Sequence, residues 1–324
     1  MEKKENGEQW NDLWRQVRSD LFLETASLSG AEKEAGKLPV AEYERNGLTV
    51  TDVCVESEEQ SRSLGRPVGR YVTLYSERLK EDDGGIHEEA VKELAGWIRK
   101  LLPEKVETVF VAGLGNPEAS PDALGPDAVS HVFVNRHLEM ETCGMEIRVC
   151  AMVPGVMAQT GLETAGILAG IVEKVRPDAV IVIDALAARS VTRLGTTIQL
   201  TDTGIAPGSG IGNHRQEISP NVLGVPVIAI GIPMVVEAAS IIYETMEAIR
   251  NVMQQENMAQ EAGFLKQLSK EEQYHLFREL LEGKARPLYV TVKDIDELEK
   301  RLSFTLAEAL NQAFSNTFQP LFPE

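Results

Sequence analysis

The fold is decided by two stretches of sequence, GLGNPEASPDALGP at residues 113–126 and AVIVID at residues 179–184. The first follows the apolar segment ETVFVA at residues 107–112, and the second is itself an apolar run that ends at Asp184. A short β-branched run that leads into a glycine-rich turn is typical of a strand followed by a helix in an α/β sheet. Asp122 and Asp184 are therefore predicted just beyond the carboxyl ends of two buried strands, at the edge where active sites of open α/β sheets form.

The surrounding sequence continues this alternation of strands and helices. The alternation implies βαβ units, and the nearly continuous apolar character of the strands implies burial on both faces. We therefore predict an α/β fold of three layers, in which a mostly parallel, twisted sheet is flanked by helices. Thr160 and Glu163 have the spacing of a helix-capping box. The predicted strands are residues 48–55, 70–75, 107–112, 146–152, 179–184, 196–201 and 225–231, and the predicted helices are residues 87–102, 127–136, 160–175 and 234–254.

The two ends of the chain differ from this α/β domain, to which we assign residues 21–257. Residues 1–20 carry one helical apolar stripe, formed by Trp10, Leu13, Trp14 and Val17. A short helix of this kind is marginal alone and needs a surface to dock on, so it is either the first helix of the domain or a detachable pro-segment. Residues 258–324 are charged and helical, and we expect them to form a C-terminal extension packed on the same domain.

The C-terminal extension has two recognisable elements. A strand is predicted at residues 288–292, and a helix at residues 293–314 with an apolar stripe that includes Leu298, Leu302 and Leu306. Such a stripe suits docking within the chain or contact between subunits.

Composition restricts the classes of partner. The chain has 324 residues and a net charge of −18, from 32 basic and 50 acidic side chains. Nucleic-acid affinity depends largely on Lys and Arg, so we expect no direct contact with nucleic acid. No segment approaches the ~20 apolar residues of a membrane span, so we expect no membrane partner. The three cysteines form neither a CxxC pair nor a zinc spacing, which favours free thiols in a reducing cytoplasm.

Other familiar motifs are present only in part. The turn at residues 113–115 lacks the third glycine of a dinucleotide loop, because position 118 is Glu. The same turn faintly resembles that of peptidyl-tRNA hydrolases, but those enzymes need a basic surface, which the acidic balance argues against. Asp202-Thr203-Gly204 is the tripeptide of pepsin-like proteases. It occurs once, in an α/β context, so a turn or local hydrogen bonding is the better interpretation.

Asp122 and Asp184 are the strongest candidates for chemistry. Two carboxyl groups that meet at one sheet edge can share a proton, so that one acts as general base and the other as general acid. Helix capping and loop hydrogen bonding are equally common roles for Asp at such places. The five histidines form no HxxxH or HExxH pair, and spacing leaves open a mixed metal site of both aspartates and one distant histidine.

A glycine-rich loop at residues 204–212, followed by Asn213-His214-Arg215, indicates a backbone that approaches another group closely. It is either a plain surface loop or a substrate-binding wall beside the aspartates. In the second interpretation, the substrate-binding residues are Gly208, Ser209, Gly210 and Asn213.

Several long motifs, all in the same order, resemble the germination protease family of endospore-forming bacteria. The resemblance runs from about Val17 to the C-terminus. The motifs are residues 113–126, 153–157, 160–165, 183–190, 196–199, 202–215 and 224–231.

This resemblance implies an unusual aspartic-type endopeptidase with the fold of hydrogenase-maturation proteases. The family's catalytic aspartates correspond to Asp122 and Asp184. The enzyme is made as a zymogen that removes its own N-terminal pro-segment, forms a homotetramer, and degrades small acid-soluble spore proteins at germination in the spore core. The stretch VRSDLFLE at residues 17–24 is similar to the family's self-cleavage site, so cleavage is expected between Asp20 and Leu21.

No cofactor or metal is expected under this interpretation. A metal-assisted endopeptidase, like the hydrogenase-maturation proteases, is the first alternative, with both aspartates as ligands. The second is a binding or scaffold protein that keeps the fold without the activity.

Overall fold

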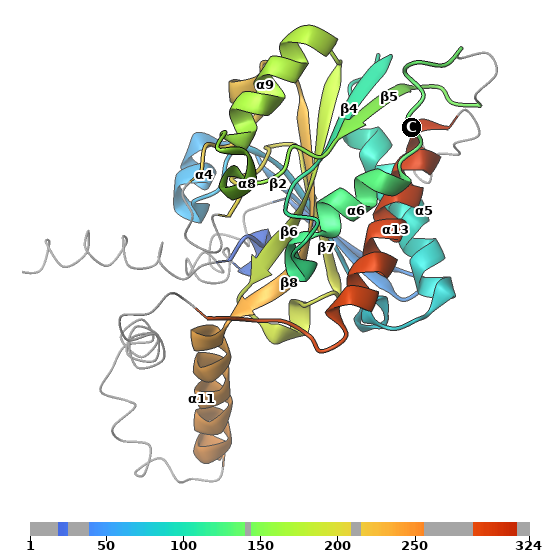
Figure 1. The fold of residues 1–324 in the computed structure, drawn as a ribbon. Helices are drawn as coiled ribbons and strands as arrows, with labels where there is room; N and C mark the ends of the chain where they lie inside the picture. The colour runs from blue at the N-terminus through green and yellow to red at the C-terminus, as the bar shows by residue number, and fades with distance from the viewer. Residues whose placement is uncertain (1–18, 25–38, 140–143, 209–214, 256–287, 316–324) are drawn as a thin grey trace, which may run out of the picture.

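The structure is a computed structural model that describes residues 19–24, 39–139, 144–208, 215–255 and 288–315. In this part of the chain, helices cover both faces of one nine-stranded sheet, which confirms the predicted three-layer α/β class (Figure 1). The strand order is β1-β2-β3-β7-β8-β6-β4-β5, and β9 pairs with β8. The strands are β1 (Val40–Arg45), β2 (Leu48–Val55), β3 (Gly69–Tyr75), β4 (Thr108–Gly113), β5 (Arg148–Met152), β6 (Ala179–Ala188), β7 (Thr197–Thr201), β8 (Val227–Glu237) and β9 (Tyr289–Val290).

The parallel part of the sheet is continuous. Strands β5, β4, β6 and β8 are neighbours and pair in parallel. The antiparallel strand β7 joins β8 to β3, and the antiparallel strand β2 joins β3 to β1. Strands β3 and β1 consequently point the same way as β8, so six of the nine described strands share one direction.

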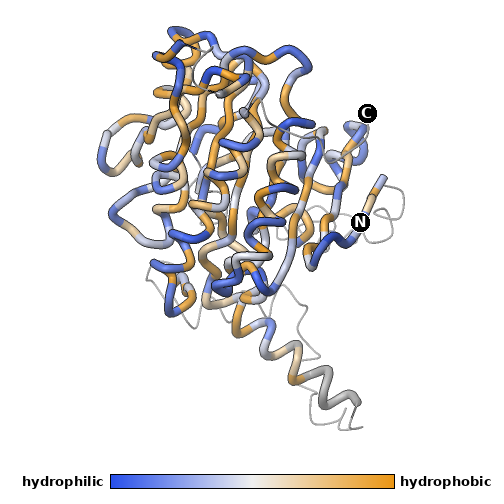
Figure 2. Tube along the Cα trace, turned by 90° about the vertical axis from the view of Figure 1, so that its right-hand side faces the viewer, coloured by the Kyte–Doolittle hydropathy of each residue, from blue (hydrophilic) through white to orange (hydrophobic). Residues whose placement is uncertain are grey.

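Each strand of the parallel core is apolar on both sides, as predicted. In β4, Val109 and Val111 face one layer of helices, whereas Phe110 and Ala112 face the other. Because successive side chains of a strand point to opposite faces, this alternation places one core on each side of the sheet. Figure 2 shows the hydrophobic segments gathered in the middle of the molecule, with hydrophilic turns around them.

Two layers of helices cover the two cores. α5, α6 and α13 pack on one face, and α9 and α10 pack on the other. The helices are α4 (Glu58–Leu64), α5 (Gly84–Leu101), α6 (Leu124–His131), α8 (Met157–Thr160), α9 (Thr164–Val175), α10 (Pro220–Leu223), α11 (Ala238–Gln255) and α13 (Ile295–Phe314), with short 3-10 turns η1 (Glu77–Lys80), η2 (Ser120–Asp122) and η3 (Val191–Arg193).

The predicted boundaries of α6, α9 and α11 are wrong. α6 begins and ends earlier than predicted, because the chain turns directly from η2 into the helix. The capping box is absent: the Thr160 hydroxyl donates to the Val156 carbonyl inside α8, and α8 ends at Gly161 in the left-handed conformation. α11 begins at Ala238 rather than at 234, because β8 continues along β6 to Glu237.

The C-terminal elements join the same body. β9 pairs with β8, and α13 packs against α5 and α6 (Figure 1). The stripe Trp10, Leu13, Trp14 and Val17 lies outside the described residues. None of the described helices combines the length and the apolar character that crossing a membrane requires.

Candidate active site

The chain reverses its direction of winding between β4 and β6. From β4 it passes through α6 to β5 on one side, and then through α9 to β6 on the other side. The carboxyl ends of two such strands form the crevice in which open α/β sheets bind their ligands. Asp122, in η2 after β4, and Asp184, near the middle of the long strand β6, lie at this crevice.

Two glycines let the backbone close around the two aspartates. A Cβ atom on Gly125 would lie 2.4 Å from the Leu114 carbonyl oxygen and 2.5 Å from that of Ile183, so α6 begins in backbone contact with both strand ends. Gly115 has φ +115°, and a Cβ there would lie 1.9 Å from the Asp122 carbonyl oxygen. Only glycine fits such positions, which explains the glycine spacing of residues 113–125.

Asp122 and Asp184 line one pocket of about 250 Å³. Asp20, Gly208, Arg215 and other residues complete its wall. An Asp122 carboxylate oxygen accepts a hydrogen bond from the Asn116 amide at 2.8 Å, and an Asp184 carboxylate oxygen accepts one from the Ala185 amide at 3.0 Å. Both carboxyl groups therefore lie in a single cavity. The prediction that Asp184 lies just beyond the end of its strand is wrong, because pairing with β8 extends β6 to Ala188.

The two aspartates differ in their affinity for a proton. Burial, then the neighbouring charges of Asp122 and Asp20, hold the pKa of Asp184 well above its usual value, against smaller opposing effects of the Ala185 amide and Arg215. Burial also raises the pKa of Asp122, whereas the Asn116 amide and the charge of Arg215 lower it. Asp184 is only 6% exposed. Within this pair, Asp184 is therefore the better proton carrier and Asp122 the better proton acceptor.

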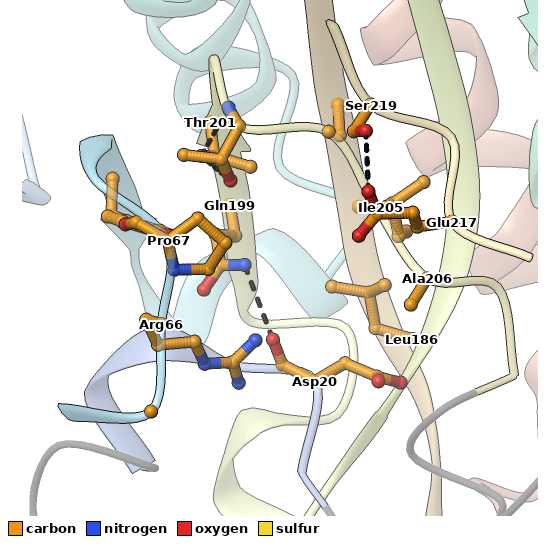
Figure 3. Close-up of a pocket in the computed structure, with 16 residues that line it drawn as sticks. Asp20, Arg66, Pro67, Leu186, Gln199, Thr201, Ile205, Ala206, Glu217 and Ser219 are labelled. Atoms are coloured by element: carbon orange, nitrogen blue, oxygen red, sulfur yellow. Dashed lines mark hydrogen bonds between the residues drawn. The ribbon is translucent and has the colours of Figure 1, made fainter. Parts of the chain in front are cut away.

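Residues 19–24, which contain the expected cleavage site, lie along the part of β6 beyond Asp184. The Asp20 amide donates to the Ala187 carbonyl at 3.0 Å, and the Ala187 amide donates to the Asp20 carboxylate at 2.9 Å. The Arg66 guanidinium donates to the carbonyls of Ser19 and Leu21 at 3.1 and 3.3 Å. Figure 3 shows Arg66 and Gln199 directed toward Asp20.

The Gln199 side-chain amide bridges the expected cut. Its oxygen accepts a hydrogen bond from the Phe22 amide at 2.6 Å. Its nitrogen donates to the Asp20 carbonyl at 3.4 Å (Figure 3). Asp20 and Gln199 also line a second pocket of about 250 Å³. Asp20 lines both pockets, so the Asp20–Leu21 bond lies where they meet.

The apolar side chains of this segment are buried in the fold. Leu21 packs in a small cluster with Leu186 and Ala188 of β6. The Phe22 ring stacks on Tyr71 of β3, with ring centroids 4.3 Å apart. Both side chains are nearly inaccessible to solvent, so the segment is part of the packed structure.

The glycine-rich loop is described only in part. Gly208 lines the pocket that contains the aspartates, whereas Ser209, Gly210 and Asn213 lie outside the described residues. Asp202 accepts a hydrogen bond from the Arg70 amide at 2.7 Å, so its carboxylate makes a contact between distant parts of the chain rather than the local hydrogen bond expected for the Asp-Thr-Gly tripeptide. Arg215 was not singled out as a site residue, although it directly follows the conspicuous glycine-rich loop and lines this pocket.

In the part of the chain that the structure describes, no three side chains of His, Cys, Asp or Glu gather as a metal site would require. His87, for example, contacts the Thr305 hydroxyl at 2.8 Å, between α5 and α13. Cys54 and Cys150 are free thiols.

Comparison with known proteins places this architecture in one family. The family model described as germination protease matches residues 19–261. The germination protease of Caldanaerobacter subterraneus subsp. tengcongensis is 41% identical over 304 residues, which cover 92% of this chain and 94% of that protein. Those of Clostridium perfringens and Bacillus mycoides are 40% and 36% identical, with 82% and 92% of this chain and 84% and 93% of those proteins covered.

Among solved structures, a NiFe hydrogenase maturation protease HycI from Thermococcus kodakarensis KOD1 is similar, with a TM-score of 0.33 and 14% sequence identity. The match covers 66% of this chain and 98% of that chain.

Proposed function

Because this chain belongs to the germination protease family and is therefore a peptidase, we propose that it is a self-processing, aspartic-type endopeptidase that cuts its own Asp20–Leu21 bond. One observation carries the proposal: the segment with the expected cleavage site is seated in the cleft that both candidate aspartates line. A capping role for Asp122 and Asp184 would not require this segment beside them.

The mechanism uses the two aspartates in different protonation states. Asp122, ionised, takes a proton from a water molecule whose oxygen attacks the Asp20 carbonyl carbon, while Asp184, protonated, donates to the carbonyl oxygen. The tetrahedral intermediate then collapses as the C–N bond breaks. Asp122 passes its proton to the leaving Leu21 nitrogen, and Asp184 recovers one from the hydroxyl that becomes the new carboxyl group. Both aspartates end in their starting states.

This division of roles follows the electrostatics of the pocket. Asp184 is the more deeply buried group, with its pKa held well above the usual value by burial and by the charge of Asp122. Asp122 lies near Arg215 and accepts the Asn116 amide, both of which favour its ionised form. A bell-shaped pH profile is expected, because activity needs one proton on the pair and is lost when both groups are ionised or both are protonated.

The wider biology is proposed from the family. Residues 1–20 are the removable pro-segment of a zymogen, residues 21–257 form the catalytic unit, and residues 258–324 form an extension packed on it. The substrates are small acid-soluble spore proteins in the spore core, and the active species is a homotetramer. The packing of α13 on α5 and α6 supports the assignment of the extension.

The test is self-processing of the full-length chain, followed by intact mass at mildly acidic pH. The wild type is expected to lose residues 1–20, while Asp122→Asn and Asp184→Asn slow the reaction by roughly 10²–10⁴-fold, the usual contribution of a general acid or base. Asp82→Asn is the matched control, since Asp82 is exposed and remote from this pocket.

Normal processing by either active-site variant would refute the aspartate mechanism. A chelator arm separates the metal-assisted alternative: loss of processing with chelator, restored by a divalent metal, would favour metal ligation by the two aspartates.

A further inference from the structure

Arg66 binds the main chain on both sides of the expected cut. Its Nη2 atom donates to the Ser19 carbonyl at 3.1 Å and to the Leu21 carbonyl at 3.3 Å. The Asp20 carbonyl, which belongs to the scissile peptide unit, accepts from Gln199 instead. The two hydrogens of Nη2 are sufficient for one bond to each of its acceptors. One planar group therefore joins the peptide unit that precedes the scissile unit to the peptide unit that follows it.

The position of Arg66 is set by the fold on both sides of it in the chain. α4 ends at Gly65, which has the left-handed conformation, and the Arg66 amide donates to the Ser61 carbonyl at 3.2 Å. One residue further, the Pro67 carbonyl accepts from the Tyr71 hydroxyl of β3 at 2.8 Å. The main chain that carries Arg66 is thus attached to a helix end and to the sheet, so the guanidinium has a fixed base from which to hold a peptide.

The charge of Arg66 strengthens its contact with the peptide. Burial lowers the pKa of the Arg66 guanidinium, and the neighbouring Asp20 and Tyr71 oppose that effect. An arginine side chain stays protonated in proteins. Because hydrogen bonds from an ionised donor are roughly twice as strong as neutral ones, Arg66 holds its two carbonyls more firmly than a neutral side chain would.

We infer that Arg66 is a positioning residue of the protease, which holds the peptide units on either side of the scissile bond by their carbonyls and so fixes which bond faces the two aspartates. This inference rests on the proposed endopeptidase function. Arg66 lines the pocket next to the one that contains Asp122 and Asp184, so it acts through the orientation of the peptide. Its acceptors are main-chain oxygens, which every residue carries, so any polypeptide bound in this register offers the same contacts.

The test is self-processing of the full-length chain with Arg66→Ala, followed by intact mass. Removal of residues 1–20 is expected to slow by about 100-fold, the cost of displacing the reacting group by about 1 Å. The share of products cut at bonds next to Asp20–Leu21 is expected to rise, because the register is less strictly held. Arg62→Ala is the matched control and should behave as the wild type, since Arg62 is exposed in the last turn of α4 and lines neither pocket.

Chemical rescue separates a positioning role from a structural one. Methylguanidinium added to Arg66→Ala should restore most of the lost rate, with a plateau as the emptied position fills. Methylammonium has the same charge but lacks the planar set of donors, so it should restore less. Arg66→Lys keeps the charge on a more flexible side chain, and its rate should lie between those of the wild type and Arg66→Ala.

The outcomes distinguish this inference from the proposed function. Processing of Arg66→Ala at the wild-type rate and position would overturn the role of Arg66 and leave the protease standing. A slow variant that methylguanidinium does not accelerate would also overturn it, because the loss would then come from a disturbed fold. An unprocessed wild-type chain would overturn the proposed function and this inference together.

Discussion

Two segments near opposite ends of the described chain dock on the sheet in different ways. Residues 19–24 lie in the cleft, where hydrogen bonds join them to β6, to the turn that follows it and to the Arg66 and Gln199 side chains. Leu21 and Phe22 of this segment are also buried. α13 lies on the face covered by α5 and α6 and is held by an apolar stripe. Its buried members are Leu298, Leu302, Leu306, Leu310 and Phe314.

The difference matches what each segment must do. An apolar stripe is stabilised by the area it removes from water, which makes the docking of α13 a contribution to the stability of the whole fold. Hydrogen bonds to a strand orient a peptide but add only about 0.5–1.5 kcal/mol each, because water replaces them. The hydrogen bonds of residues 19–24 therefore set the register of this segment on the strands, whereas the apolar stripe of α13 contributes mainly to stability.

The largest effect is expected from a substitution that weakens the packing of α13 on the sheet. Leu302→Ala should lower the free energy of unfolding by about 2–5 kcal/mol, because Leu302 is fully buried and its truncation leaves a cavity. Chemical denaturation measures this loss. Phe304→Ala is the control on the same helix, since Phe304 is 53% exposed and should change stability by less than about 0.5 kcal/mol. Similar losses in the two variants would contradict the proposed role of the stripe.

A smaller effect is expected from a substitution in the cleft that holds residues 19–24. Gln199→Met keeps the length of the side chain but removes both hydrogen bonds across the Asp20–Leu21 bond. Self-processing should slow by about 10–100-fold, since the peptide loses a donor to the carbonyl under attack. Thr201→Val, on the same strand, tests for a general disturbance of β7. Wild-type processing by Gln199→Met would show that Gln199 does not position the cut.

The smallest effect is expected in the pH dependence of stability, to which Glu299 on α13 contributes. Burial, then the charge and hydrogen bond of Asp127, raise the pKa of Glu299 on α13 to about 8, with a smaller contribution from Asp296 and opposition from Lys300. Because this folded-state pKa lies above the unfolded value, stability is fully present at low pH and is lost as pH rises through about 8. Glu299→Gln removes that loss. Its melting temperature should match the wild type near pH 5 and exceed it by about 2–4 °C near pH 9.

Thermal unfolding across this pH range measures the effect, and processing of the variant should stay normal because Glu299 lines neither of the two pockets that Asp20 lines. An advantage of the variant at low pH instead of high pH would contradict the sign of the Glu299 shift.

Local sequence was sufficient to predict those features that depend on residues close together in the chain. The apolar runs of β4 and β6 and the glycines after β4 predicted that Asp122 and Asp184 would share one sheet edge, and both line one pocket. β1 was missed because its edge-strand sequence, VAEYER, is mostly exposed and lacks an apolar run. The predicted start of α11 was wrong because pairing of Val235 and Val236 with β6, and of Val236 and Glu237 with β9, extends β8 to Glu237, against the helical periodicity of this stretch.

The position at which residues 19–24 dock on the sheet cannot be predicted from such patterns. Phe22 contacts Gln199, and Glu24 contacts the main chain of Arg189 and Ser190, across more than 160 residues of sequence. These donors are main-chain amides, so the residue types at 189 and 190 do not indicate that they hold a carboxylate. Arg215 was missed for a related reason: its charge lowers the pKa of Asp122 only because the fold places the two residues near each other.

The sequence by itself determined the α/β class, the strands of the parallel core and the edge at which the two aspartates lie. These depend on residue periodicity and on the glycines needed for backbone contact, which are local properties. Only the tertiary structure decided that the expected cleavage segment lies against β6, that Gln199 bridges the cut and that two main-chain amides hold Glu24. Those contacts depend on the register between distant strands, because main-chain hydrogen-bonding groups are the same in every residue except proline and acquire meaning only from their partners.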